Sequence, residues 1–195
     1  MAGLVQLLDE IRACRLCEAH LPMGPRPVLQ ASASARILIA GQAPGRKVHA
    51  SGQPFTDASG DRLRAWLGMP PDVFYDPNRV AIVPMGFCYP GTGPSGDLPP
   101  RPECAPQWRE RVLQELAHLQ LTLVIGQYAL AYHLPGTSGR SVTQTVQSWR
   151  EHWPTVVPLP HPSPRNNRWL RLNPWFEAEL LPQLRARVAE VLARA

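Results

Sequence analysis

Four short apolar runs recur along the chain, and none of them alternates hydrophobic with polar positions. Such a run is typical of a strand that is buried on both faces of a sheet. The predicted strands are residues 36–41, 80–83, 121–125 and 155–159. Between them, apolar residues recur at the three- and four-residue spacing of amphipathic helices. The predicted helices are residues 3–14, 60–67, 107–119, 127–134, 142–149 and 174–195.

Strand and helix therefore alternate, and parallel neighbours in a sheet need crossover connections of the kind that helices provide. We expect one α/β domain over residues 1–195, with three α/β/α layers around a mostly parallel four-stranded sheet. The last helix carries its own start signal, with Asn173 as a candidate cap and Pro174 at the first helical position.

Composition excludes several classes of protein. The 44% of hydrophobic residues and the 18% of charged residues are typical of a globular chain rather than a disordered one. The apolar runs are far shorter than the ~20 residues that cross a bilayer, so we expect no membrane association. The N-terminus lacks the basic start, apolar centre and cleavage site of a secretory signal, which predicts a cytoplasmic protein. We further expect a monomer.

The net charge of +5 favours a polyanionic partner. Lys47 is the only lysine, so nearly all of the positive charge is carried by arginine, whose planar guanidinium suits phosphate. A genome rich in G and C would produce the same arginine bias, so the charge alone does not decide between the two explanations. The 23 prolines predict that much of the chain is rigid loop.

Glycine, proline or polar residues follow all four predicted strands. They lie in residues 41–45, 84–88, 126–128 and 160–167. In open α/β sheets, ligands bind outside the carboxyl ends of the strands, so a functional cleft is expected at this edge.

Two segments carry candidate site residues. His161 directly follows the fourth strand and precedes a run of phosphate-binding residue types, although a single histidine is often structural. Phe55, Asp57 and Asp61 lie near the start of the predicted helix 60–67. Here too a structural interpretation is open, since Phe55 can be a core aromatic and the two aspartates can cap the helix or face its dipole.

These motifs resemble those of the uracil-DNA glycosylase superfamily. Residues 41–45 are similar to its first motif, G-x-x-P-G, residues 52–55 to G-x-P-F, and residues 161–163 to H-P-S, in the superfamily's order. The resemblance implies a DNA repair enzyme that hydrolyses the N-glycosidic bond of a base flipped out of DNA. It implies stacking of that base on Phe55, hydrogen bonds to it from His161 and the backbone near Gln42, and further substrate contacts at Gly41, Ala43 and Ser163.

The chain departs from the superfamily at two positions. Many members carry an aspartate where this chain has Ala43, whereas an acid-free branch has an aspartate in a segment similar to residues 55–61. This likeness implies that Asp57 is the catalytic carboxylate, with Asp61 as the second candidate and His49 as a weaker one.

The second departure concerns the base that is recognised. Pro84 stands where the cluster-binding members usually have an asparagine that reads the pyrimidine edge. Proline offers neither a side-chain donor nor an N–H group, so backbone groups of Met85, Gly86 and Phe87 are the predicted substitutes. Uracil is the expected substrate. Hypoxanthine, or a member that binds DNA without catalysis, is the alternative.

The cysteines indicate a metal or cluster site. Cys14 and Cys17 form C-x2-C, and fifteen residues separate Cys88 from Cys104. In a reducing compartment such cysteines are more often ligands than disulfides, and four of them can hold a tetrahedral zinc ion. Their spacing also resembles that of the bacterial and archaeal branches with a 4Fe-4S cluster, which implies that a structural cluster is bound.

The resemblance places Arg165 and Asn166 at the DNA surface, where residues after H-P-S enter the gap left by the flipped base. Further arginines are plausible phosphate contacts, namely Arg26, Arg46, Arg101 and Arg168. A redox protein that uses the cluster for electron transfer is a weaker alternative, because no dinucleotide fingerprint accompanies it.

Overall fold

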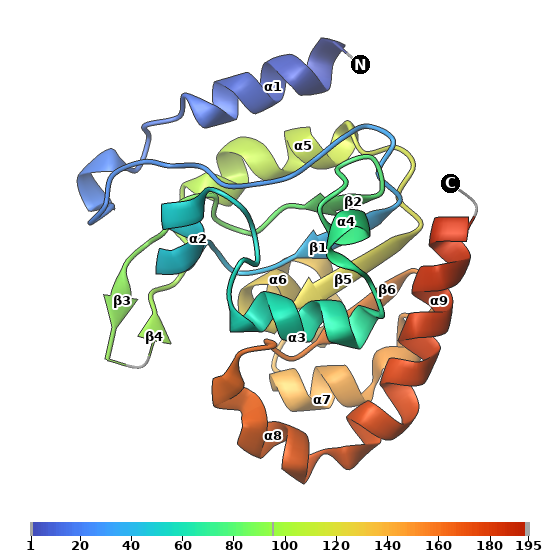
Figure 1. Ribbon diagram of the computed structural model, residues 1–195. Coiled ribbons are helices and arrows are strands. Elements are labelled where there is room, and N and C mark those ends of the chain that lie inside the picture. The colour runs from blue at the N-terminus through green and yellow to red at the C-terminus, as the bar shows by residue number, and fades with distance from the viewer. Residues whose placement is uncertain (1, 95, 194–195) are drawn as a thin grey trace.

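The computed structural model describes residues 2–94 and 96–193, and it contains a parallel four-stranded sheet (Figure 1). The strands are β1 (Ile37–Ala40), β2 (Val80–Ile82), β5 (Leu121–Ile125) and β6 (Val156–Leu159), in the order β2-β1-β5-β6. In the register, Ile37 lies opposite both Val80 and Leu121. All four predicted strands are confirmed to within two residues, and so is the predicted α/β fold.

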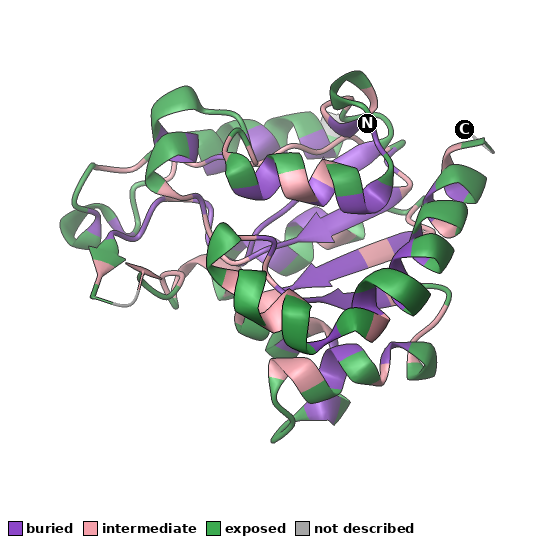
Figure 2. Cartoon of the chain, turned by 60° about the horizontal axis from the view of Figure 1, so that its bottom comes forward, coloured by how far each residue is buried: buried purple, intermediate pink, exposed green. Residues whose placement is uncertain are grey.

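Helices cover both faces of the sheet because its residues alternate in direction and are apolar on both sides. On one face, Leu38 packs with residues of α1 (Ala2–Arg12) and α5 (Glu110–Gln114). On the other face, Ile39 packs with α3 (Ala58–Leu67), α7 (Val142–Gln147) and α9 (Leu181–Ala193). Figure 2 shows the buried strands between helices whose outer faces are exposed. The three predicted layers are therefore present.

The connections contain short elements that the hydrophobic pattern did not predict. They are α2 (Arg46–Ser51), α4 (Pro71–Phe74), α8 (Asn167–Leu172) and the antiparallel pair of β3 (Thr92–Gly93) and β4 (Gly96–Asp97). Each spans at most six residues, too few for a helical or alternating pattern to emerge. The hairpin projects from the body beside α2 (Figure 1).

Two predicted helices begin with wide, π-helical turns. The first prediction, 107–119, corresponds to a π-helical segment at Ala105–Arg109 followed by α5, and its last five residues are not helical. The C-terminal helix starts at Pro174 as predicted and widens at Phe176–Leu180 before α9, while residues 194–195 lie outside the described part. A proline lies in or just after each wide segment, and proline cannot donate the i→i−4 bond.

Asn173 does not cap this helix as expected. Its side-chain oxygen accepts a hydrogen bond from the Trp175 indole at 3.2 Å, and only its backbone carbonyl accepts from the N–H of Phe176, at 3.0 Å.

The predicted helix 127–134 corresponds to α6 (Gly126–His133). None of the helices in the described residues has the length and apolarity needed to span a membrane.

Candidate active site

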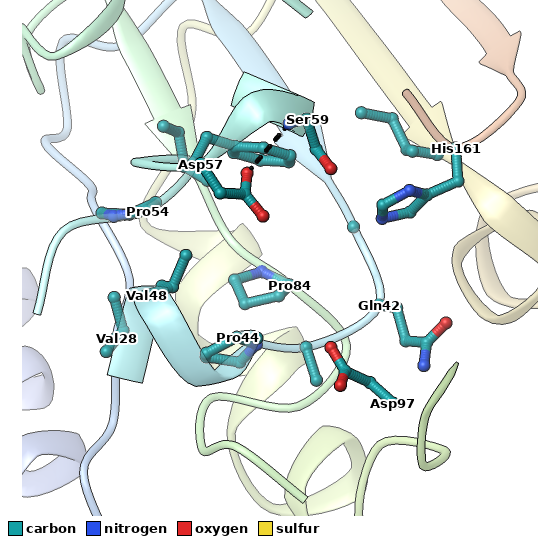
Figure 3. A pocket seen from close by; sticks show the side chains of 16 residues that line it. Val28, Gln42, Pro44, Val48, Pro54, Asp57, Ser59, Pro84, Asp97 and His161 are labelled. Carbon is teal, nitrogen blue, oxygen red and sulfur yellow. Dashed lines mark hydrogen bonds between the residues drawn. The ribbon is translucent and has the colours of Figure 1, made fainter. Parts of the chain in front are cut away.

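A cavity opens at the carboxyl edge of the sheet, where the strand order reverses between β1 and β5. Its volume is about 90 Å³, several times the roughly 10–15 Å³ that one water molecule needs. Side chains from segments far apart in the sequence point toward it (Figure 3). Six of the predicted site residues line it, namely Gly41, Gln42, Ala43, Phe55, Asp57 and His161.

His161 follows β6 and faces the cavity (Figure 3). Its Nδ1 accepts a hydrogen bond from the backbone N–H of Ser163 at 3.1 Å, so the ring proton lies on Nε2. The side chain of Asn166 donates to the carbonyl of His161 at 2.6 Å. Burial lowers the pKa of His161, and the negative charges of Asp57 and Asp97 oppose this shift. The neutral imidazole therefore presents an N–H donor.

Asp57 caps α3 and also lines the cavity. Its Oδ1 accepts from the backbone N–H groups of Ser59, at 3.1 Å, and Gly60, at 3.2 Å. Because both bonds use one oxygen, Oδ2 keeps its acceptor capacity on the side where Figure 3 shows the carboxylate facing the cavity. The structural interpretation, a helix cap, is thus correct, and the cap is what fixes the orientation of the carboxylate.

Phe55 adopts a strained backbone conformation, with φ at +54°, which costs about 1–3 kcal/mol at a residue other than glycine. Its carbonyl accepts hydrogen bonds from the Tyr75 hydroxyl at 2.9 Å and from Arg64 Nη1 at 3.2 Å. The ring packs edge-on against Phe74, with centroids 6.0 Å apart. A Cβ on Gly60 would lie 1.8 Å from the Phe55 carbonyl oxygen, so the turn requires glycine there.

Hydrogen bonds hold the start of the first loop at Gly41 and Gln42. The Gln42 side chain donates to the carbonyl of Leu98 at 3.0 Å, which ties the loop to the residue after β4. The carbonyls of Gly41 and Gln42 accept from the backbone that follows β2, at 2.8 and 2.9 Å. The start of the loop is therefore anchored to two segments, the one after β2 and the residue after β4.

The structure brings Pro84 to the cavity, but not the three residues after it. The N–H groups of Met85 and Gly86 are the donors to the first loop, and both residues are buried. The Phe87 side chain packs in the core around α1, and its N–H donates to Cys104 Sγ at 3.3 Å. These three N–H groups are thus bonded within the protein, which leaves their predicted role in reading the base without a geometric basis.

The segment after His161 lies at the surface. Arg165 and Arg168 are exposed, and the Arg165 guanidinium lies against Gly96 in the β3–β4 hairpin. Ser163 does not line the cavity: its Oγ accepts from the Arg165 N–H at 3.2 Å, and its carbonyl accepts from Arg62 of α3 at 3.0 Å. Ser163 therefore supports the loop that carries His161.

Two polar residues of the cavity wall were not predicted. Asp97 reaches it from β4, where its Oδ1 accepts from the Thr92 hydroxyl at 3.1 Å. Its Oδ2 would lie 3.2 Å from a Cβ on Gly45, so it approaches the first loop closely. Ser59 lies one residue inside α3. The sequence around residue 94 contains a proline-serine-glycine turn signal, which was the available indication of a hairpin there.

The weaker carboxylate and histidine candidates lie outside the cavity lining. Asp61 is exposed and pairs with Arg64 at 2.5 Å. His49 is buried in α2 against Tyr89, with ring centroids 6.0 Å apart, and burial lowers its pKa.

The arginines predicted to contact phosphate have different surroundings. Arg46 is exposed at the start of α2. Arg26 donates to the carbonyl of Ala50 at 2.9 Å, and Arg101 pairs with Glu103 at 2.6 Å. Arg46 is therefore the one of these three without such a partner among the interactions of the described residues.

All four cysteines line a second cavity, on the α1 side of the molecule, with a volume of about 20 Å³. Cys14 and Cys17 follow α1, Cys88 follows the β2 segment, and Cys104 precedes the π-helical turn. Within residues 2–94 and 96–193, no group of three or more His, Cys, Asp or Glu side chains is arranged to hold a single metal ion.

The surroundings of these thiols are mostly apolar, with walls that include Ile11 and Trp108. Burial raises the pKa of Cys88 to about 11 and that of Cys104 to about 12, so both are protonated unless a metal displaces the proton. Four cysteines thus line one mostly apolar cavity, and the Phe87 N–H donates to one of the sulfurs; cysteine thiolates are the ligand type that holds iron-sulfur clusters.

A model of the uracil DNA glycosylase superfamily matches residues 29–185. The matched part contains the whole sheet, the segments that line the first cavity, and Cys88 and Cys104, whereas Cys14 and Cys17 precede it. Its α/β architecture agrees with the fold described above. Because the match spans most of the chain and includes the cavity at the sheet edge, the chain belongs to the uracil DNA glycosylase superfamily, whose members act as DNA glycosylases on damaged bases.

Proposed function

We propose that this protein hydrolyses the N-glycosidic bond of a deaminated base flipped out of DNA, with uracil as the preferred base. The observation that carries the proposal is the meeting of Phe55, Asp57 and His161 with the first loop around one cavity. These groups match the needs of the reaction, which are a platform for the base, a donor to the departing base and a carboxylate near the sugar.

His161 acts on the leaving base. When the glycosidic bond breaks, its electron pair moves to the base, and in uracil the negative charge collects largely on O2. The Nε2–H of the neutral His161 donates a hydrogen bond to this oxygen, and it does so most strongly as the charge develops. A histidine whose pKa is lowered by burial keeps this donor neutral, so the base departs as an anion without prior proton transfer.

Asp57 acts on the sugar. The free Oδ2 stabilises the positive charge of the sugar and orients the water molecule that attacks its C1′. The water adds its oxygen to C1′ and loses one proton, which balances the charge of the departing base. Phe55 meanwhile stacks on the flipped base, a contact that contributes on the order of 1–3 kcal/mol.

The cavity supports a site for one flat base. Its volume of about 90 Å³ is several times what a water molecule needs. Its lining includes the apolar side chains of Val28, Val48, Ile82 and Ile125, which select a flat base through shape and stacking. Uracil is proposed ahead of hypoxanthine on the resemblance of the motifs. Pro84 remains the feature that favours the alternatives, a hypoxanthine enzyme or a protein that only binds DNA.

The exposed segment after His161 is the proposed contact with the duplex. Arg165 enters the gap left by the base together with the half-buried Asn166, whose amide also donates to the His161 carbonyl, and Arg168 binds phosphate. Each phosphate contact releases counterions, so binding weakens as salt rises. The hairpin that touches Arg165 extends this surface next to the cavity.

The test is a measurement of base release from single- and double-stranded oligonucleotides that carry uracil, hypoxanthine or xanthine. We expect uracil release, and we expect Asp57→Asn to lower its single-turnover rate by about 10²- to 10⁴-fold. Asp72→Asn, at an exposed position on α4, is the matched control and should keep the rate. Binding of the same oligonucleotides without release of any base would replace the enzyme with the DNA-binding alternative.

We also propose that the four cysteines hold a 4Fe-4S cluster with a structural role. When bound, the cluster ties the segment after α1 to the residues before α5 through Cys17 and Cys104. Anaerobically purified protein should show broad visible absorption and about four irons and four sulfides per chain. Cys104→Ser should lower the iron content and the melting temperature together. One zinc ion per chain, with no iron, would instead support the tetrahedral site.

A further inference from the structure

Arg109 is a fully buried arginine. It belongs to none of the sequence motifs and has no role in the proposed reaction. It lies at the end of the π-helical turn before α5. Its Nη1 donates to the backbone carbonyls of Val83 and Pro84, at 2.8 and 2.9 Å, and its Nη2 contacts His133 Nε2 at 2.5 Å. The guanidinium therefore binds directly to the wall of the active-site cavity from behind.

The charge of Arg109 is not offset by a carboxylate. Among the residues described, no Asp or Glu lies within ion-pair distance of it. Its partners are neutral: two carbonyls, the Tyr132 ring 5.1 Å away, and His133, whose Nε2 must be an acceptor because arginine only donates. A buried charge without a counter-charge exerts a strong field on its surroundings, because little water screens it.

Pro84 connects Arg109 to the cavity. It lines the cavity next to the first loop, and its carbonyl accepts a hydrogen bond from Arg109. When the glycosidic bond breaks, the electron pair leaves with the base into this cavity. A positive charge on the far side of the wall lowers the energy of that anion more than the energy of the neutral bound base.

We propose that Arg109 is a positioning residue of the active site, which holds the Pro84 wall in place and stabilises the departing base anion through that wall. The inference rests on the proposed function and adds a residue outside the cavity lining. Cys104 would be a counter-charge to Arg109 only as a thiolate, the form that a bound metal would favour. The hydrogen bonds of the guanidinium nevertheless go to the cavity wall and not to that sulfur.

The effect of a substitution at Arg109 on two different leaving bases distinguishes an electrostatic role of this residue from a purely structural one. 5-Fluorouracil is a more acidic base than uracil, so its anion needs less stabilisation. In Arg109→Met, which removes the charge and keeps much of the side-chain volume, single-turnover release of uracil should fall by about tenfold or more. Release of 5-fluorouracil should fall much less. The rate of 5-fluorouracil release divided by the rate of uracil release should therefore rise several-fold. Arg109→Lys retains a charge. When both proteins are measured at pH 6, this variant should have the same ratio of rates as the original protein.

Arg64→Met is the matched control. Arg64 also donates to a cavity residue, the carbonyl of Phe55, but its charge is paired with Asp61. This variant should slow both bases by the same factor. Thermal melting and iron content are measured for each variant, and Arg109→Lys carries the test if Arg109→Met does not fold.

The outcomes are distinct. Equal slowing of both bases in Arg109→Met, or an altered ratio in Arg109→Lys at pH 6, would overturn the inference while the proposed function stands. A loss of iron with an unchanged ratio would assign Arg109 to the cysteine cavity instead. An unsubstituted protein that releases neither base would overturn the proposed function, and this inference with it.

Discussion

At the scale of single residues, the environment of His161 predicts how the rate of base release depends on pH. Its proposed donor role requires the neutral imidazole, with Nδ1 accepting from Ser163 and the proton on Nε2. Because burial lowers its pKa below the ordinary 6.5, the neutral form persists through neutral pH. The single-turnover rate of uracil release should therefore be level from pH 8 to pH 6.5 and fall only at lower pH, where the ring becomes protonated.

His49 provides the control for this profile, because it is also buried with a lowered pKa but does not line the cavity. His49→Gln should keep the acid limb in the same place. A rate that already falls between pH 8 and pH 7 would contradict the neutral donor.

Sequence reasoning placed His161, Asp57 and Phe55 in the candidate site because each belongs to a short contiguous motif at the end of a strand or the start of a helix, and all three line the cavity. It did not find Asp97 or Arg109. Asp97 reaches the cavity through a hairpin whose strands have two residues each, and Arg109 is part of a helix whose amphipathic pattern explains it as an ordinary position. Their neighbours come from distant segments, and that information lies in the packing rather than in local spacing.

At the scale of elements, the start of α3 positions two residues of the cavity lining. Its cap, Asp57, and the strained Phe55 lie two residues apart. Gly60, in the first turn of α3, has no side chain and so lets the Phe55 carbonyl lie close to the helix. Gly60→Ala should displace the Phe55 carbonyl, since the new Cβ would lie 1.8 Å from it. We expect a loss of base release of about tenfold or more and a destabilisation of about 1–3 kcal/mol.

Gly136→Ala is the matched substitution, because a Cβ there meets no atom within 4 Å and φ is not positive. It should leave the rate of base release and the urea midpoint nearly unchanged. Equal effects of the two substitutions, or normal release by Gly60→Ala, would show that the Phe55 turn does not need this close contact.

Elements differed in how well the hydrophobic pattern predicted them. The strands were found because burial on both faces makes each of them a continuous apolar run, as in β5. The helices α2, α4 and α8 were missed because they are short and lie in loops rich in proline and glycine, where turn signals outweigh periodicity. The site edge was nevertheless predictable, since parallel strands all end on one side.

At the scale of the whole molecule, the stability of the fold should decrease in acid because of His133. Burial, together with the charge of Arg109, lowers the pKa of His133 to about 4. The unfolded chain takes up a proton at this residue near pH 6.5, whereas the folded chain does so only near pH 4. Its contribution to stability is therefore complete above pH 6.5 and is lost as the pH falls to about 4, by an amount on the order of 3 kcal/mol.

His133→Gln tests this linkage and links it to the buried arginine. The glutamine oxygen can accept the Arg109 N–H in place of Nε2, but it does not titrate. Unfolding free energies from urea titrations at pH 7 and pH 5 should then differ less in the variant than in the original protein. The sign must be the same in both, since the lowered pKa values of His49 and His161 remain. An unchanged difference would mean that His133 is protonated equally in the folded and unfolded chains, and that neither burial nor the guanidinium beside it lowers its pKa.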